Sequence, residues 1–323
     1  MRTLQRRGSF SAQPGVADIT ALAYSPTEPL LAVGGHSNMV QLWRIDGTPH
    51  LVRSLSGLHP VLGEPEAIQA IEFSPNGRLI AASEAIQILQ PDSSTSDSHT
   101  RRGALLALWQ TDTGRLNSGL YPLDLGRGLA PFDPVAFSPN SRLVAVGAAD
   151  GSNLIIDTAT AEKRSLRQPT GHQYTRSLAF SPNGTLAAGT LNGTIELWNP
   201  ISREPTAGPL LVTAGPVSSV AFDSTGQRFV TTASQDGSVK LFATSTLQQE
   251  GPTLNTPPGA ASTATFAPRG NSLLVANDDG NAFTWAVSLT ALEQRACAIA
   301  GRNLTHQEWN QFVPGQSYRR TCP

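Results

Sequence analysis

Apolar and polar residues alternate along most of this chain in short runs that end at turn residues. A period of two is the pattern of β-strands with one buried face. No amphipathic helical stretch interrupts it before Leu289. Six of these runs carry an aromatic residue at the same register, just before a turn: ALAYSP (21–26), AIEFSP (70–75), PVAFSP (134–139), SLAFSP (177–182), SVAFDS (219–224) and TATFAP (263–268).

Each of these runs is followed by a second run, a tight turn and a third run. The tight turn is Asp-Gly or Asn-Gly in four units, and such pairs supply the positive φ angles that hairpins need. The third run ends on a large residue that we expect to be buried and to stabilise its unit: Trp43, Trp109, Ile156, Trp198, Phe242 and Trp285. The second unit is longer, and its residues 86–103 predict a surface loop, either a recognition loop or a tolerated insertion.

Six antiparallel units in series predict an all-β protein, a β-propeller of six four-stranded blades, with seven blades as the alternative. We expect residues 1–288 to form the propeller. The sixth unit has three predicted strands, so a strand at about residues 7–13 is expected to close it, because a ring should leave no exposed edge. Residues 289–323 are expected to form a short helical tail packed on the propeller.

The repeats resemble those of the WD40 family over about residues 19–285. The fourth unit is the most similar, with Gly171-His172 before its first strand and Leu197-Trp198 at the end of its third. The resemblance implies a structural role for His172 beside Trp198. No unit has the Trp-Asp pair of the family, so we expect the blades to be held mainly by apolar packing.

The tail resembles a C-terminal segment that follows bacterial WD40 propellers, including those of STAND-type NTPases and other multidomain signalling proteins. That resemblance implies a sensor or regulatory module. The chain contains no G-x-x-x-x-G-K-[ST] phosphate loop. Thr305 to Glu308 reads as a helix capping box. Cys297 and Cys322 bracket the tail and predict a disulfide or a close thiol pair, with the oxidation state left open.

Charge and hydropathy exclude some classes of function. The formal net charge is -1, which gives no electrostatic footprint for nucleic acid. The N-terminal MRTLQRRGSFS lacks the apolar core of a signal peptide, and no run of about 18 apolar residues exists. We therefore expect a cytoplasmic protein with no nucleic-acid or membrane partner, and the resemblance of the tail implies a bacterial one.

No motif in the chain points to catalysis, a metal or a cofactor. The histidines show no metal-ligand spacing, Cys297, His306 and Cys322 lack a fourth zinc ligand, and there is no G-x-S-x-G elbow. The leading hypothesis is a non-catalytic scaffold for a protein or peptide partner, such as an NTPase or protease domain in the same or a neighbouring polypeptide. The alternative is a propeller enzyme, a hydrolase or lyase, with its site at the central channel.

Overall fold

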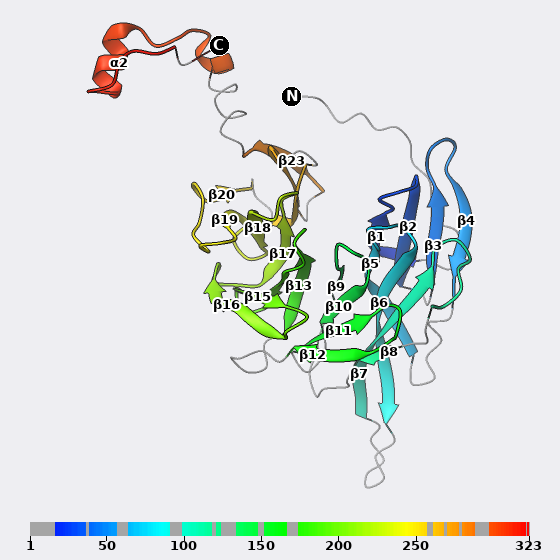
Figure 1. Cartoon of the computed structure of the whole chain (residues 1–323). Coiled ribbons are helices and arrows are strands. Elements are labelled where there is room, and N and C mark those ends of the chain that lie inside the picture. Colours follow the sequence, from blue (N-terminus) through cyan, green and yellow to red (C-terminus); the bar gives the residue numbers. More distant parts are fainter. Residues whose placement is uncertain are drawn as a thin grey trace.

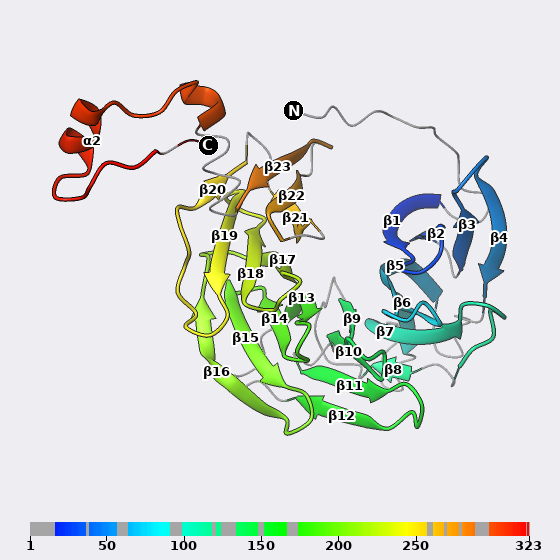
Figure 2. The same ribbon diagram turned by 45° about the horizontal axis from the view of Figure 1, so that its top comes forward.

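The computed structural model describes residues 17–36, 39–56, 64–90, 99–117, 121–123, 134–147, 152–166, 174–256, 261–267, 270–277, 280–287, 297–320 and 322. Within these residues the chain forms six antiparallel sheets in chain order, arranged as the blades of a propeller (Figures 1 and 2). The prediction of a six-bladed all-β propeller is confirmed. Five sheets have four strands, and the sixth has three within the described residues.

Blades 1 to 3 cover the first half of the chain. Blade 1 consists of β1 (Ala17–Tyr24), β2 (Leu30–His36), β3 (Val40–Arg44) and β4 (His50–Leu55). Blade 2 consists of β5 (Glu64–Phe73), β6 (Leu79–Gln90), β7 (His99–Gln110) and β8 (Tyr121–Leu123). Blade 3 consists of β9 (Val135–Phe137), β10 (Leu143–Gly147), β11 (Asn153–Asp157) and β12 (Lys163–Leu166).

Blades 4 to 6 complete the propeller. Blade 4 consists of β13 (Thr175–Phe180), β14 (Leu186–Thr190), β15 (Thr194–Asn199) and β16 (Glu204–Leu211). Blade 5 consists of β17 (Val217–Phe222), β18 (Arg228–Ala233), β19 (Ser238–Ala243) and β20 (Leu254–Asn255). Blade 6 consists of β21 (Ala261–Phe266), β22 (Ser272–Asn277) and β23 (Ala282–Ala286). The predicted closing strand at 7–13 lies outside the described residues and stays a prediction.

Apolar side chains between consecutive blades form the core. Ala32, Val40 and Leu42 of blade 1, for example, join Ile68 and Phe73 of blade 2 in one buried cluster. Polar side chains of the first strand of a blade add hydrogen bonds to the backbone of the next blade. Thr20 donates to the carbonyl of Ile68 (2.6 Å), and Ser177 donates to the carbonyl of Val217 (3.0 Å). Apolar packing and side-chain hydrogen bonds therefore both link consecutive blades.

The expected loop over 86–103 is wrong for most of its length. β6 and β7 continue as a paired ribbon, in register from Ile86 opposite Gly103 to Gln90 opposite His99. The ribbon projects from blade 2 (Figure 1). The backbone hydrogen bonds of the extended pairs satisfy groups that a loop would leave to water, so the insertion lengthens a hairpin.

The C-terminal tail contains a helical turn at 297–300 and helix α2 (His306–Phe312). Both views draw the tail apart from the blades (Figures 1 and 2). Its packing on the propeller stays a prediction. No helix in the described part of the chain is long and apolar enough to cross a membrane.

Candidate functional site

The candidate site is a groove of about 890 Å³ that crosses blades 1, 2 and 3. It lies at the end of the blades where the first strand turns into the second and the third into the fourth. Its lining residues are Thr27, Glu28, Leu30, Leu42, Arg44, Val52 and Arg53 of blade 1, Asn76, Gly77, Arg78, Leu79, Gln110, Thr111, Asp112 and Asn117 of blade 2, and Ser141, Thr158 and Ala159 of blade 3. Turn residues therefore supply most of the lining.

The Ser-Pro-Asn-Gly turn of blade 2 is held rigid by its own side chains. Ser74 Oγ accepts from the N–H of Leu79 (2.9 Å) and donates to Asn76 Oδ1 (2.8 Å). Asn76 Oδ1 also accepts from the N–H of Arg78 (3.0 Å). The N–H of Asn76 donates to Ser141 Oγ of blade 3 (3.1 Å). These bonds fix the backbone of the groove and explain the serine and asparagine as turn formers.

A glycine lets this turn approach blade 1. Gly77 has φ 70°, and a Cβ at this position would clash with Thr27 Oγ1 and lie 3.1 Å from Thr27 Cβ. Glycine adopts this left-handed conformation without strain and leaves room for the neighbouring turn. The turns of blades 1 and 2 that line the groove therefore touch at Thr27 and Gly77.

The groove carries both signs of charge, and one cation is unpaired. Arg44 forms an ion pair with Glu28 (3.2 Å), and Arg53 donates to the carbonyl of Asp112 (3.0 Å). The exposed guanidinium of Arg78 forms neither an ion pair nor a hydrogen bond with any residue in the described ranges. Arg78 is thus available to a carboxylate or carbonyl group of a ligand, which a guanidinium binds through two parallel hydrogen bonds.

A second unmet polar group lies beside Arg78. Thr111 Oγ1 is buried and has no hydrogen-bond partner among the residues that the structure describes. Its backbone N–H donates to the carbonyl of Arg78 (2.9 Å), which joins the two turns of blade 2. A buried hydroxyl without a partner costs free energy that a ligand would recover. The groove therefore suits a polar, extended ligand. What it offers such a ligand is hydrogen-bond donors, the Arg78 guanidinium and the Thr111 hydroxyl.

Two buried carboxyl groups of blade 2 lie outside the groove. Burial raises the pKa of Glu72 to about 8, although the N–H of Phe137 donates to its Oε2 (2.9 Å). Burial also raises the pKa of Glu84 to about 8, and neither of its oxygens has a hydrogen-bond partner within the described ranges. Neither carboxyl group lines the groove, and Glu72 instead contacts the backbone of blade 3. Among the described residues no group of three or more His, Cys, Asp or Glu could hold a metal ion.

The large residues expected at the end of each third strand do not line the groove. Trp43, Trp109, Trp198 and Phe242 are buried, and Trp285 is half-buried. Trp109 Nε1 donates to the carbonyl of Ser56 (3.1 Å), in the stretch that leads from blade 1 to blade 2. Their role in stabilising the blades stays a prediction. His172 lies outside the described residues.

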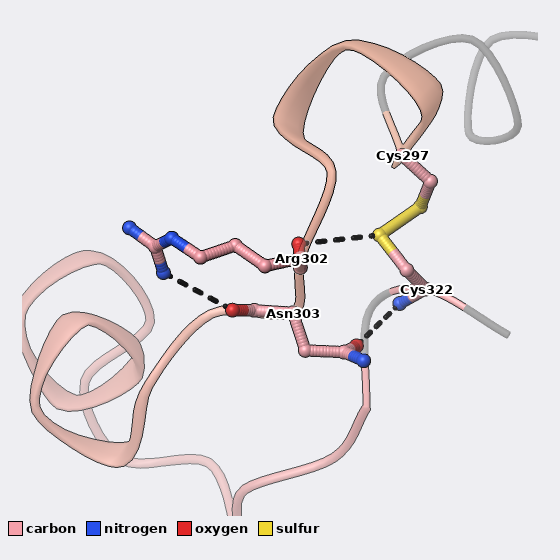
Figure 3. Close-up of a disulfide and its surroundings, with 4 residues drawn as sticks. All are labelled: Cys297, Arg302, Asn303 and Cys322. Atoms are coloured by element: carbon pink, nitrogen blue, oxygen red, sulfur yellow. Dashed lines mark hydrogen bonds between the residues drawn. A yellow bond between two sulfur atoms is a disulfide. The ribbon is translucent and has the colours of Figure 1, made fainter.

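The tail is closed by a disulfide between Cys297 and Cys322, whose Cα atoms lie 5.4 Å apart (Figure 3). The N–H of Cys322 donates to Asn303 Oδ1 (2.7 Å), and Arg302 Nη1 donates to the carbonyl of Asn303 (3.1 Å). Because both sulfurs are in the disulfide, this pair leaves no thiolate for the zinc set that includes His306.

The capping box predicted at the start of α2 is present. Glu308 donates its N–H to the Thr305 hydroxyl (3.2 Å), and its side chain accepts from the N–H of Thr305 (2.8 Å). Arg302 binds both oxygens of Glu308 at 2.7 Å, and this side-chain pairing is the main reason why the pKa of Glu308 falls to about 2. The last turn of chain before α2 is thereby fixed.

Sequence reasoning did not single out Arg53, Arg78 or Thr111. In the sequence each looks like an ordinary surface residue, Arg53 of a strand and the other two of turns, and only the assembled blades bring the three together. The available signal is positional: Arg78 directly precedes the second strand of its repeat, and Thr111 directly follows the third.

Comparison with known proteins supports the repeat assignment. A model described as WD domain, G-beta repeat matches residues 5–44, 163–199 and 208–242. The chain is also 35% identical over 140 residues to "WD repeat-containing protein SL1-17" of Schistosoma mansoni. This match covers 42% of the chain and 43% of the relative, so it spans less than half of either protein. WD40 repeats in a β-propeller are therefore supported by sequence similarity and by the fold.

Proposed function

We propose that the chain is a non-catalytic protein-interaction scaffold, and that the groove across blades 1 to 3 receives an extended segment of its partner. The observation that carries this proposal is the pairing of a rigid groove with unmet polar groups. Arg78 has no ion-pair partner in the described part of the chain, and the buried Thr111 hydroxyl has no hydrogen-bond partner there. The similarity to a WD repeat-containing protein supports the same class.

Charge favours a partner segment with an acidic side chain. The other groove arginines are engaged, Arg44 with Glu28 and Arg53 with the Asp112 carbonyl. A carboxylate placed beside Arg78 would gain a charge-assisted hydrogen bond, worth about 1.5–3 kcal/mol where it is shielded from water. No observation on the described residues favours the enzyme alternative, whose site was expected at the central channel.

A narrower form of the proposal is a regulatory module of a multidomain signalling protein. It rests on the resemblance of the tail to segments that follow bacterial propellers, and it would make an NTPase or protease domain the partner. The rigid blades suit this role, because a platform that does not deform can hold a second domain in one orientation.

The test is affinity capture with the tagged full chain from lysate of its native cells, in three forms. The chain with Arg78→Glu should lose a protein that the unchanged chain retains. The chain with Arg115→Glu should retain it, because Arg115 is exposed in the same blade but does not line the groove. The captured protein, once purified, should bind the Arg78→Glu chain at least about tenfold more weakly, a loss of about 1.4 kcal/mol. Equal binding by both variants would reject the groove as the site.

A further inference from the structure

The tail holds a pocket of its own, with a volume of about 640 Å³. Three stretches of chain line it: the helical turn that begins at Cys297, the stretch from Arg302 to Val313, and the returning segment from Gln316 to Cys322. All the described lining residues belong to the tail. The pocket is therefore separate from the groove across blades 1 to 3.

The floor of this pocket is apolar. Its least exposed lining residues are Trp309, which is buried, and Leu304 and Val313, which are half-buried. The indole N–H is not free for a ligand, because Trp309 Nε1 donates to the carbonyl of Gln316 (2.9 Å). The floor thus offers a ligand apolar contact instead of hydrogen bonds.

Two arginines at the rim of the pocket are unpaired. The exposed guanidinium groups of Arg319 and Arg320 line the pocket and form neither an ion pair nor a hydrogen bond with any residue that the structure describes. Arg302, which also lines the pocket, differs from them because it binds both carboxylate oxygens of Glu308 at 2.7 Å. The rim therefore carries two positive charges that the described residues leave uncompensated.

The tail does not hold the side chains to neutralise these charges. Glu308 is the one acidic residue between positions 297 and 323, and three arginines with this one glutamate give the stretch a formal charge of +2. Both oxygens of Glu308 are engaged by Arg302, and Oε2 also accepts from the N–H of Thr305 (2.8 Å). The charge of the pocket therefore favours an anionic ligand.

The backbone that carries the two rim arginines is anchored on both sides. Before residues 319–320, the Tyr318 hydroxyl donates to the carbonyl of Leu304 (2.9 Å). After them, Cys322 is held by the disulfide and donates its N–H to Asn303 Oδ1 (2.7 Å; Figure 3). A ligand would order two side chains and not the backbone, which lowers the entropic cost of binding.

The concave setting separates these arginines from arginines on an open surface. Water surrounds an ordinary exposed guanidinium, so an ion pair there contributes little. Beside an apolar floor part of this water is displaced, and the attraction for an anion is stronger. A guanidinium binds a carboxylate through two parallel hydrogen bonds. A doubly charged phosphate would lose more hydration against the floor than a carboxylate, which carries one charge.

We propose that the tail pocket binds a carboxylate that is attached to an apolar group. The carboxylate would lie at Arg319 and Arg320, and the apolar group would cover the floor beside Trp309. A small organic acid and the last residue of a polypeptide both present this chemistry. The site goes beyond the proposed function, since it adds a second, disulfide-closed binding site to the scaffold. It also uses different arginines, so it can fail independently of partner capture through the groove.

The test follows 4-fluorophenylacetate by fluorine NMR as the full oxidised chain is added. The probe signal should shift and reach saturation. The neutral 4-fluorophenylacetamide, of nearly the same shape, should bind at least about tenfold more weakly, because it lacks the charge that the arginines recognise. Unlabelled phenylacetate should displace the probe, and inorganic phosphate at the same concentration should not. Equal binding of the acid and the amide, or equal displacement by phosphate, would overturn the inference.

Matched charge variants locate the site. Arg319→Gln/Arg320→Gln should weaken binding of 4-fluorophenylacetate at least about tenfold, while the emission of Trp309 stays unchanged because both arginines are exposed. Arg78→Gln/Arg115→Gln removes two charges from blade 2, one inside the groove and one outside it, and should leave the Kd within about twofold. The opposite order would place the probe in the groove, and equal Kd values for all three chains would exclude the rim arginines. Either result would reject the tail pocket as the site.

Reduction with dithiothreitol tests the part played by the disulfide. The reduced chain should bind 4-fluorophenylacetate at least about tenfold more weakly, because Cys322 no longer anchors the segment that carries Arg319 and Arg320. Undiminished binding would contradict a disulfide-closed site.

A second competitor distinguishes the two sources of the carboxylate. N-acetylphenylalanine presents the groups that end a polypeptide chain. Displacement of the probe at a lower concentration than phenylacetate requires would assign the site to a polypeptide terminus, and displacement only at a higher concentration would assign it to a small organic acid. Displacement by neither compound would contradict the proposal.

Discussion

Glu72 of β5 accepts a hydrogen bond on Oε2 from the backbone N–H of Phe137, across the boundary between blades 2 and 3 (2.9 Å). Ser219 plays the same part between blades 5 and 6, where its Oγ accepts from the N–H of Ala264 (3.0 Å). At the boundary between blades 2 and 3 a carboxyl group thus accepts the kind of bond that a hydroxyl accepts between blades 5 and 6. Burial raises the pKa of this carboxyl group, that of Glu72, to about 8. The contact between blades 2 and 3 therefore depends on the protonation state of the Glu72 carboxyl group.

Stability should fall as pH rises from about 4.5 to about 8. The pKa values of Glu72 and Glu84 are raised to about 8 in the folded chain and return to about 4.5 on unfolding. Below 4.5 both states hold the protons. Between the two values the unfolded chain has lost them while the folded chain keeps them, so each group lowers the free energy of unfolding by roughly 1 kcal/mol per pH unit. Above about 8 the loss is complete.

Glu84→Gln should flatten this dependence, because the amide stays neutral at every pH. Urea unfolding of the variant between about pH 5 and pH 8 should show a smaller slope, with the largest gain over the unchanged protein near pH 8. Glu250→Gln, which alters an exposed glutamate of blade 5, is the matched control and should keep the original slope. Parallel curves for all three proteins would contradict the raised pKa of Glu84.

The strands could be predicted from the sequence because each carries its own signal. Alternation places residues such as Leu197 on a buried face, and Asn192-Gly193 favours the tight turn that joins β14 to β15. The ribbon formed by β6 and β7 was missed because a serine- and aspartate-rich centre hid the pairing of its flanks. Whether a face is covered depends on the neighbouring blade, so the exposure of Leu22 and Tyr24 could not be predicted from their own repeat.

The groove was beyond sequence reasoning for a different reason. Arg78 becomes distinctive only because the neighbouring arginines, Arg44 and Arg53, are engaged by groups from other turns. The tail gave a clearer signal, since Thr305 and Glu308 are three residues apart and bond to each other through local geometry alone. Local motifs are thus readable, and partners that meet across blades are not.

The turns of blades 4 and 6 should respond differently to one substitution. Gly193 and Gly280 have nearly equal φ angles, 81° and 83°, in corresponding turns. A Cβ at Gly193 would clash with the carbonyl oxygen of Thr213, whereas a Cβ at Gly280 would meet nothing within 4 Å. Gly280→Ala should cost about 1 kcal/mol from backbone strain alone, and Gly193→Ala at least about 3 kcal/mol.

Chemical denaturation of the two variants checks this difference. The strain of alanine in the left-handed region is common to both, so the excess cost of Gly193→Ala measures the clash with the chain that leads into blade 5. Equal costs would mean that the turn of blade 4 moves away from Thr213 without loss.

The tail should depend on its disulfide. Trp309 is its one buried large side chain among the described residues, at 3% exposure, with Nε1 donating to the carbonyl of Gln316 (2.9 Å) and Tyr318 packed edge-on at 5.8 Å. So small a core does not hold a unit of this size by burial alone. The disulfide closes a loop with a sequence separation of 25. By lowering the entropy of the unfolded tail, it should stabilise the folded tail by about 3 kcal/mol.

Cys297→Ser/Cys322→Ser, or reduction with dithiothreitol, should therefore release Trp309 to water. The contribution of Trp309 is isolated by subtracting the spectrum of a Trp309→Phe chain treated in the same way. The fluorescence emission of Trp309 should shift to the red, and acrylamide should quench it more strongly. The Tm of the blades should stay unchanged, because the disulfide closes only residues of the tail. An unshifted emission after reduction would mean that the capping box and the Arg302–Glu308 pair hold the tail without the covalent bond.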